Sequence, residues 1–461
     1  MARGSEFLQA HQPSLVQQRG CRSLFVWGPL GQWLVVDAEV ASLLGQFTQP
    51  RRADDIIREH ARRSNISPEA ATATVGSAID ALIERGILSE TLSVVLPRQD
   101  PLRIASLAFN ITNRCNLRCP WCYNRCEEEA KVPIADLIAW IRAGGSALTD
   151  DAAFIILGGE PFLDEARLLE TITGARQQFH DEVLVSTNGT MLGSAMPAEL
   201  AKAAVTVQIS LDGPTAASHD AIRGVGVFER AVSNARRFVA AGVRTVFSMV
   251  ITRGSEEQFE AYFDLAVRVG VDEVRFIPLR RIGRGTVHAD RVPDLYASFC
   301  RLVELLGRRP ELARLMARDF FSILMIACRF SRLRDNCGIG RQSLFVDADG
   351  SIYPCPNHRE PSDSCGNVWE RPLASILQTS PVLACFRQRY TLEQMPECRS
   401  CAFSHWCAGD CRAEALSVSG RPDTPSPYCD DLRRMLQDML WLIADGWGGI
   451  GVRPQTFRTW S

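Results

Sequence analysis

The chain has 461 residues, 46% of them hydrophobic, and a formal net charge of −2 at pH 7. This length predicts two or three domains with sizeable cores, and the near-neutral charge gives no bulk field that would attract nucleic acid or a membrane. No apolar run reaches about 18 residues, so no transmembrane helix is expected. The start lacks the basic-then-apolar order of a signal peptide, which predicts a cytoplasmic protein. In a reducing cytosol, its 16 cysteines are better suited to metal binding or chemistry than to disulfides.

The first segment, residues 1–96, combines short strands with helices. The stretch "CRSLFVWGPLGQWLVVD" predicts two strands around a Gly-Pro-Leu-Gly turn, and "ILSETLSVVL" is expected to add another. Three stretches between them have helical spacing: "AEVASLLGQF", "ADDIIREHARR" and "SPEAATATVGSAIDALIERG". In the third, Ser67 is the predicted N-cap, Pro68 the first helical residue and Gly86 the C-cap. This pattern predicts a winged helix-turn-helix domain, which residues 97–103 link to the next segment.

The second segment, residues 104–285, alternates strands with helices. Strands are expected at "IASLAFNIT", "FIILGGE", "EVLVSTNG", "VTVQISLDG", "VRTVFSMVIT" and "EVRFIPL". Six such units predict an α/β fold, a partial (β/α)6 TIM-type barrel with a parallel sheet and helices outside. Residues 286–336 are expected to form bridging helices, residues 337–430 a loop-rich domain dense in cysteine, and residues 431–461 a C-terminal helix and tail.

The loop after the first barrel strand contains Cys115-x3-Cys119-x2-Cys122. Thiolates are soft ligands suited to iron–sulfur clusters, and three of them leave one iron of a [4Fe–4S] cube open. A zinc knuckle or chance thiols are the alternatives. The spacing, with the aromatic Tyr123 after the last cysteine, resembles the radical S-adenosylmethionine (radical SAM) superfamily. The resemblance implies that SAM occupies the open iron and is cleaved reductively to a 5′-deoxyadenosyl radical.

Short polar or glycine-rich motifs end the next three strands, where barrel folds place their active sites. In "GGEP", the glycines permit close backbone approach and Glu160 can pair with a cation, which resembles the family's motif for the amino group of SAM. Similar proteins use residues at the ends of the following strands for the rest of SAM, and an arginine for its carboxylate. The resemblance therefore implies these SAM contacts: Tyr123, Gly158, Gly159, Glu160, Ser186, Asn188, Ser210 and Asp212 (toward the ribose), and Arg223 (toward the carboxylate).

A second cysteine group lies near the C-terminus. It reads Cys398-x2-Cys401-x5-Cys407-x3-Cys411 followed by Cys429, with Cys337 and Gly350-x4-Cys355 upstream. A zinc ribbon would also fit part of this spacing. The whole pattern resembles the SPASM domain, which holds two auxiliary [4Fe–4S] clusters and so implies three clusters in the chain.

The resemblance also implies how the ligands are shared. It gives the outer cluster Cys398, Cys401, Cys407 and Cys429, and the inner cluster Cys337, Cys355 and Cys411. The inner cluster is then one ligand short, and either Cys365 supplies it or one iron stays open. Cys126 is expected to be a free thiol, because a fourth ligand beside the first triplet would block SAM.

Residues 1–98 contain ten Arg, no Lys and ten Asp or Glu, a balance that argues against DNA binding. The pattern of strands, three helices and "LIERGIL" resembles the peptide-binding domain of the PQQ-biosynthesis chaperone, the RiPP recognition element. Such a domain would add a leader peptide as an extra strand. A structural cap on the barrel is the alternative.

Together these resemblances imply a maturase of ribosomally made peptides. It would abstract a hydrogen from a core residue and form a carbon–carbon cyclophane or thioether crosslink. Its expected partners are a precursor peptide and an electron donor such as flavodoxin or ferredoxin, with no nucleic acid and no membrane. Epimerisation, decarboxylation and formylglycine formation are the enzymatic alternatives, and a metal-stabilised peptide-binding scaffold is the non-enzymatic one.

Overall fold

Nine strands form one continuous sheet that runs from the barrel into the cysteine-rich region, in the order β12-β11-β10-β9-β8-β7-β13-β14-β15. The computed structural model describes the chain except residues 1–6, 93–102, 125–130, 317–329, 331–332 and 448–461. Six neighbouring strands pair in parallel and form the predicted partial barrel: β7 (Ile104–Asn110), β8 (Leu148–Leu157), β9 (Val183–Thr187), β10 (Thr206–Ser210), β11 (Thr245–Ile251) and β12 (Glu273–Pro278). This part of the fold prediction is confirmed.

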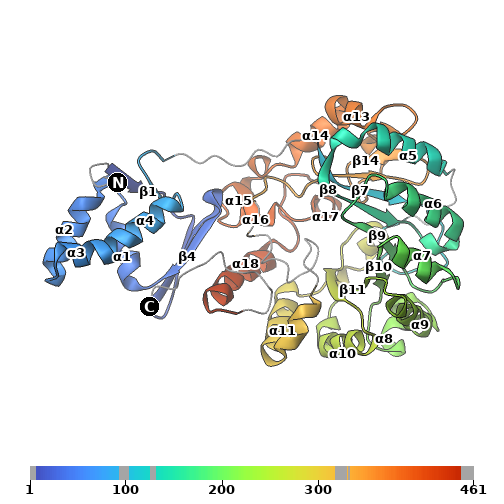
Figure 1. Cartoon of the computed structure of the whole chain (residues 1–461), viewed down its shortest axis with the longest axis horizontal. Coiled ribbons are helices and arrows are strands. Elements are labelled where there is room, and N and C mark those ends of the chain that lie inside the picture. The colour runs from blue at the N-terminus through green and yellow to red at the C-terminus, as the bar shows by residue number, and fades with distance from the viewer. Residues whose placement is uncertain (1–6, 93–102, 125–130, 317–329, 331–332, 448–461) are drawn as a thin grey trace.

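Helices cover the outside of these strands (Figure 1). They are α5 (Ile134–Ala143), α6 (Glu165–Ala175), α7 (Met196–Lys202), α8 (Ala216–Arg223), α9 (Val227–Ala240) and α10 (Phe259–Val269). In α9 the apolar residues recur every three or four positions, and Phe228, Ala231, Ala235 and Phe238 are buried as a result. Strand β10 is buried along most of its length, as expected for a parallel strand covered on both faces.

Three strands that the sequence analysis did not predict extend this sheet beyond β7. Strand β13 (Ser343–Val346) pairs in parallel with β7, and β14 (Ser351–Tyr353) and β15 (Gly366–Asn367) continue the sheet in antiparallel pairing. The region predicted to be loop-rich therefore also contains short strands that belong to the barrel sheet. Its helices are α13 (Leu373–Thr379), α14 (Pro381–Arg389), α15 (Pro396–Arg399), α16 (Ser404–Cys407), α17 (Arg412–Ser419) and α18 (Cys429–Ala444).

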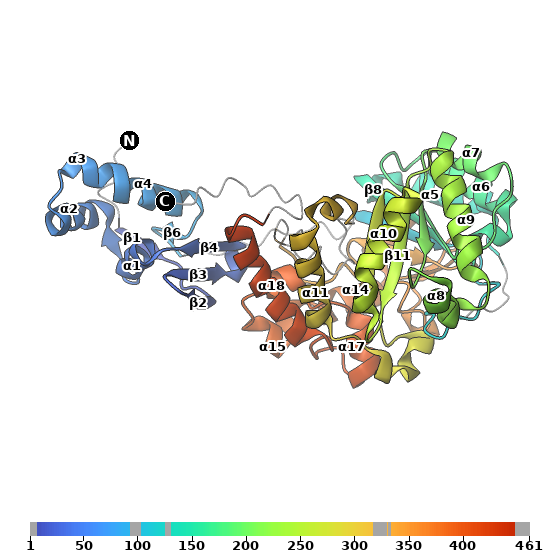
Figure 2. The same cartoon turned by 90° about the horizontal axis from the view of Figure 1, so that it is seen from below.

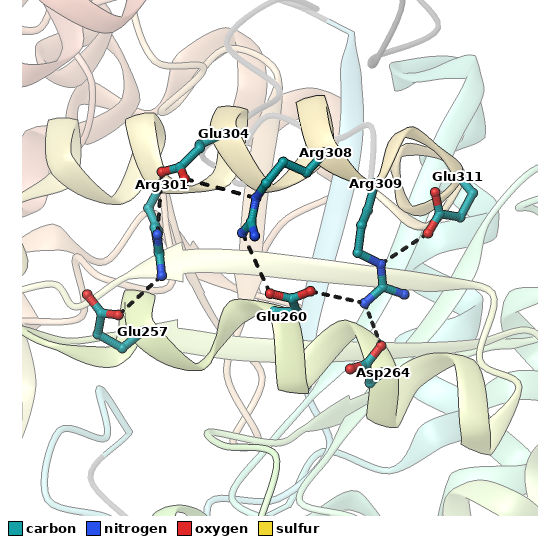
Figure 3. Close-up of polar contacts among 8 residues, drawn as sticks. All are labelled: Glu257, Glu260, Asp264, Arg301, Glu304, Arg308, Arg309 and Glu311. Carbon is teal, nitrogen blue, oxygen red and sulfur yellow. Dashed lines mark hydrogen bonds and ion pairs between the residues drawn. The ribbon is translucent and has the colours of Figure 1, made fainter.

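The predicted bridging region contains helix α11 (Leu295–Arg308), while its residues 317–329 and 331–332 lie outside the described part of the chain. Ion pairs join the C-terminal part of α11 to α10 and the turn before it (Figure 3). They are Arg301–Glu257 at 3.4 Å, Arg308–Glu260 at 3.6 Å, Arg309–Glu260 at 3.4 Å and Arg309–Asp264 at 2.8 Å. Because these side chains are partly exposed, each pair contributes at most about 1 kcal/mol.

The N-terminal part lies at the opposite end of the molecule from the barrel (Figures 1 and 2). Its elements are the antiparallel sheet β2 (Leu15–Arg19), β3 (Arg22–Trp27) and β4 (Gln32–Val36), the small sheet β5 (Arg51–Arg52), β1 (Phe7–Ala10) and β6 (Leu88–Ser89), and the helices α1 (Ala38–Gln46), α2 (Ala53–Ser64), α3 (Pro68–Ala71) and α4 (Ser77–Glu84). A π-helical turn joins α3 to α4.

The predicted helix signals in this part are confirmed. The Ser67 hydroxyl accepts the N–H of Ala70 at 3.2 Å, Pro68 begins the helix, and Gly86 lies just after its end with φ +68°. The strand prediction was less accurate. Strand β2 was missed because its sequence, LVQQR, is largely exposed and lacks apolar alternation. The strand expected at "ILSETLSVVL" is confined to Leu88–Ser89, and residues 93–96 lie outside the described residues.

Helix α18 joins the N-terminal sheet to the rest of the molecule (Figure 2). The Trp441 indole N–H donates to the Gln17 side chain at 2.7 Å, and Arg19 pairs with Asp438 at 2.5 Å. The turn after β3 also contacts the cysteine-rich region, since a side chain at Gly28 would collide with the carbonyl of Ala402. Among the described residues, no helix is long and apolar enough to cross a membrane.

Candidate functional site

The loop after β7 carries Cys115, Cys119 and Cys122 at the C-terminal edge of the parallel strands. All three thiols are partly exposed, and none forms a disulfide with another described residue. Burial raises the pKa of Cys119, while the nearby Arg223 lowers it. The sequence-predicted triplet therefore lies where barrel folds place their chemistry. Cys126 lies outside the described residues.

The two glycines of "GGEP" pack directly against this cysteine loop. Gly159 N–H donates to the Thr112 carbonyl at 2.7 Å, and Glu160 N–H donates to the Arg114 carbonyl at 2.9 Å. A Cβ at Gly158 would lie 2.8 Å from the Thr112 oxygen, and one at Gly159 would collide with the Arg114 carbonyl. The two glycines therefore allow the backbone after β8 to pack closely against the cysteine loop.

The Glu160 side chain ties the end of β8 to the end of β9. Its carboxylate is fully buried and accepts from the Thr187 hydroxyl at 2.6 Å, the Asn188 N–H at 2.7 Å and the Phe162 N–H at 3.1 Å. Burial raises the pKa of Glu160, and these three hydrogen bonds oppose that rise. The observed role of Glu160 is to hold two strand ends together, while its predicted contact with SAM stays a prediction.

Polar side chains from the end of β9 reach the cysteine loop. The Asn188 amide donates to the Asn116 side chain at 2.8 Å and lies 3.9 Å from the Cys115 sulfur. Asn116 in turn donates to the Thr190 hydroxyl at 2.8 Å. Asn188 was predicted from its motif, whereas Asn116 was missed. Ser186, two residues before Asn188, accepts from Gln208 at 3.2 Å.

A buried ion pair lies beside the cysteine loop, between β10 and α8. Arg223 Nε donates to Asp212 Oδ2 at 2.7 Å, and the other Asp212 oxygen accepts the Val250 N–H at 3.0 Å. Although burial lowers it, the pKa of Arg223 is raised overall by Asp212 and by the thiols Cys119 and Cys122. Both predicted residues are thus brought to the site, with Asp212 fixing the guanidinium. Ser210 ends the same strand, β10, two residues before Asp212.

The opposite side of the cysteine loop is held by residues that the motifs did not reveal. Arg284, in the loop after β12, donates from its backbone to the Cys122 carbonyl at 3.1 Å and from Nε to the Cys119 carbonyl at 3.0 Å. Arg359, from the cysteine-rich region, donates to the Tyr123 carbonyl at 3.3 Å, and its Cζ lies 5.8 Å from the Tyr123 ring centre. The only signal for Arg284 was its position just after the last barrel strand.

Asp347, directly after β13, joins the cysteine-rich region to the same loop. It accepts from the Asn113 amide at 2.9 Å and pairs with Arg359 at 3.3 Å. Because β13 is the neighbour of β7, this contact is a consequence of the continuous sheet.

The four cysteines assigned to the outer cluster lie around one cavity, which is lined by Cys398, Cys401, Cys407 and Cys429. They come from α15, α16, α18 and the turn after α15, and are separated by up to 31 positions in the sequence. Burial raises the pKa of Cys398 to about 11, and the neighbouring Cys429 and Cys401 raise it as well. A common cavity lined by thiols fits an iron–sulfur cluster.

The three cysteines assigned to the inner cluster also lie together. Burial raises the pKa of Cys355, and the neighbouring Cys411 and Cys337 raise it further. Burial raises the pKa of Cys411, which is about 11 despite the opposing effect of the nearby Arg280. Cys365 belongs to a different apolar cluster from the one that Cys337 and Cys355 contact, and its sulfur lies 3.7 Å from the Asp363 carbonyl.

Arg280, just after β12, connects the barrel to this inner group. Its guanidinium pairs with Asp410 at 2.7 Å and with Glu414 at 2.8 Å, and both carboxylates are buried. Because Asp410 precedes Cys411, this ion-pair network fixes an inner-group thiol relative to the barrel.

The donor set consists of thiolates, which are ligands of iron–sulfur clusters. In the described parts of the chain, no three His, Cys, Asp or Glu side chains are arranged to hold one metal ion. A cubane instead places each thiolate on a different iron, which suits spaced sets of three and four cysteines.

Comparisons with known proteins agree with this site. The radical SAM superfamily matches residues 109–266, and the SPASM iron–sulfur cluster-binding domain matches residues 337–402. Mycofactocin maturase MftC of Mycobacterium tuberculosis H37Rv is 34% identical over 283 residues, which cover 59% of this chain and 69% of that protein. PqqA peptide cyclase of Methylobacterium sp. 4-46 is 28% identical over 340 residues, which cover 71% of this chain and 86% of that protein.

Two solved structures share the fold. Streptococcus suis SuiB bound to its precursor peptide SuiA superposes with a TM-score of 0.55 at 16% identity, covering 92% of this chain and 99% of that one. Native anSMEcpe with bound AdoMet superposes with a TM-score of 0.59 at 18% identity, covering 74% of this chain and 99% of that one. With the cysteine loop, the ion pair and the two cysteine groups in place, these matches show that the chain belongs to the radical SAM/SPASM peptide maturases.

Proposed function

We propose that this enzyme binds the leader of a ribosomally made precursor peptide and crosslinks residues of its core within the barrel. The observation that carries the proposal is the three-cysteine loop at the C-terminal edge of the parallel strands, where the Cys119 and Cys122 thiols lie beside the Arg223–Asp212 pair. When bound, the [4Fe–4S] clusters and SAM supply the 5′-deoxyadenosyl radical and an acceptor for the electron that crosslinking releases.

The chain's own residues would hold and orient these groups. Cys115, Cys119 and Cys122 would bind the first cluster through three irons, which leaves one for SAM. Asp212 holds the Arg223 guanidinium beside the cysteine loop. This guanidinium is a suitable partner for the SAM carboxylate, because it can donate two parallel hydrogen bonds to it. The remaining SAM contacts rest on the family resemblance: Tyr123, Gly158, Gly159, Glu160, Ser186, Asn188 and Ser210.

We assign three clusters to the chain, one at the triplet, an outer one at Cys398, Cys401, Cys407 and Cys429, and an inner one at Cys337, Cys355 and Cys411. The shared cavity of the outer thiols and the mutual proximity of the inner ones support this count. An electron donor such as flavodoxin or ferredoxin would reduce them.

We assign leader binding to residues 1–96 as a winged-helix RiPP recognition element. Its three-stranded sheet followed by helices supports this assignment, and β4 forms one edge of that sheet. An extended peptide can add to such an edge through backbone hydrogen bonds. Attachment of this part to α18 would keep the bound precursor on the same molecule as the barrel, which raises the effective concentration of its core.

Mass spectrometry of the precursor peptide after co-expression with the chain tests this function. The precursor to co-express is to be sought among short open reading frames that neighbour the gene. A crosslink predicts the loss of two hydrogens and a fragmentation gap across the linked residues. An unchanged mass with an inverted residue would indicate epimerisation, and loss of carbon dioxide would indicate decarboxylation. An unmodified peptide in the presence of fully reconstituted enzyme would refute the proposal.

A further inference from the structure

The inner cysteine group has three thiols, so one iron of a cubane there lacks a ligand from Cys337, Cys355 or Cys411. Cys365 is a poor source. Its thiol is 4% exposed within the main apolar core, lies against the Asp363 carbonyl and interacts with Ser380. A different side chain, that of His358, shares its aromatic neighbours with two thiols of the group.

His358 lies three residues after Cys355 in a tight turn. The His358 N–H donates to the Cys355 carbonyl at 3.1 Å, and the two residues form an antiparallel bridge pair. Residues directly opposite in such a pair project their side chains to the same face, with Cβ atoms about 4.5–5.5 Å apart. The imidazole and the Cys355 thiol therefore lie on the same face of the turn.

The surroundings of the imidazole are shared with the inner thiols. Its ring centre lies 5.0 Å from that of Phe386 and 5.7 Å from that of Tyr390. These two aromatic residues form a small apolar cluster against which Cys337 and Cys355 pack. One aromatic wall thus contacts His358 and two of the three inner thiols.

The imidazole is buried with one nitrogen unused. His358 is 5% exposed, and its Nε2 has no hydrogen-bond partner among the described residues. Nδ1 faces the Asp363 carboxylate at 3.6 Å. A buried polar atom without a partner is costly and calls for an explanation. Metal-bound histidines usually present their second ring nitrogen to a carboxylate, as this one does.

We propose that His358 Nε2 is the fourth ligand of the inner cluster. The Tyr390 hydroxyl is also buried and without a partner in the described residues, but a phenol must lose its proton to bind iron, whereas neutral imidazole binds directly. The inference rests on the inner cluster of the proposed function. An imidazole ligand in place of a thiolate raises the reduction potential of a cluster.

Pulsed electron paramagnetic resonance tests the ligand directly. The full chain with Cys115, Cys119 and Cys122 replaced by Ala would retain the two auxiliary clusters. After partial reduction, a directly bound histidine nitrogen should couple to the inner cluster, and isotopic labelling of histidine should shift that coupling. The coupling should disappear in His358→Ala.

A second variant covers the case in which His358→Ala does not fold. His358→Cys should keep the iron content and lose the nitrogen coupling. It should also shift the reduction potential of the inner cluster to a more negative value. Tyr390→Phe and Cys365→Ala should retain the coupling. An inner cluster with no histidine coupling, or with coupling that survives in either His358 variant, would overturn the inference alone. Iron for one auxiliary cubane only would overturn the inner cluster and the inference together.

Discussion

Replacing Gly159 with Ala should displace the cysteine loop from the end of β8. The added Cβ would lie 2.6 Å from the Asn113 oxygen and closer still to the Arg114 carbonyl. These neighbours are backbone atoms, which cannot rotate away as a side-chain end could. The loop must move, and the hydrogen bonds from Gly159 to Thr112 and from Glu160 to Arg114 would be strained or lost.

The cost can be bounded from these contacts. Overpacking typically costs about 1–3 kcal/mol, and each backbone hydrogen bond contributes about 0.5–1.5 kcal/mol, so the native loop position should lose about 2–6 kcal/mol. Because about 1.4 kcal/mol corresponds to a factor of ten, we expect 5′-deoxyadenosine formation to fall by at least about tenfold. The assay is anaerobic SAM cleavage by reconstituted enzyme, normalised to iron bound.

Two other glycines provide controls. Gly158→Ala places its Cβ 2.8 Å from one carbonyl oxygen and should have a smaller effect. Gly307→Ala, in helix α11, meets nothing within 4 Å and should be neutral or stabilise by up to about 1 kcal/mol. Wild-type SAM cleavage by Gly159→Ala would refute the proposed packing of the loop.

Three further predictions concern the buried charges and the loop anchors. Arg280→Leu removes the cation that pairs with two buried carboxylates and should lower the free energy of unfolding by about 3–5 kcal/mol in urea titrations. Arg301→Leu, at an exposed pair, should lower it by less than about 1 kcal/mol. Arg284→Leu removes a side-chain hydrogen bond to the Cys119 carbonyl and should speed the loss of iron from the first cluster to a chelator. An unchanged rate of iron loss would contradict the role of Arg284 in holding the cysteine loop. Burial and Arg223 lower the pKa of His219 from 6.5 to about 4. The unfolded chain therefore binds the proton first, and unfolding free energy should fall from pH 6.5 toward pH 4, less so in His219→Gln.

Much of the architecture could be predicted because its signals are local. The six barrel strands have continuous apolar stretches that end in polar or glycine-rich motifs, and Ser67 and Gly86 mark helix ends by their chemistry. The pairing of β13 with β7 could not be predicted. It joins Ser343 to Ser106, positions far apart in the chain, and a four-residue strand has too little periodicity to identify its partner.

In the candidate site, too, local motifs could be predicted and long-range contacts could not. Cysteine spacing identified three groups, and the structure brings together the members of each assigned cluster. The residues that hold the first loop were missed, because Arg284 and Arg359 come from distant segments and belong to no recognisable motif. His358 was also missed, because its proposed role rests on a buried ring nitrogen without a partner among the described residues, which only the packed structure reveals.

The most direct test of the central claim is SAM cleavage by the reconstituted chain. Three cubane clusters predict about twelve irons per chain and 5′-deoxyadenosine on reduction. Replacing Cys115, Cys119 and Cys122 with Ala should abolish 5′-deoxyadenosine while about eight irons remain at the auxiliary sites. Cleavage that persists without the triplet, or a colourless protein that binds zinc instead, would contradict the assignment of the triplet to a SAM-binding cluster.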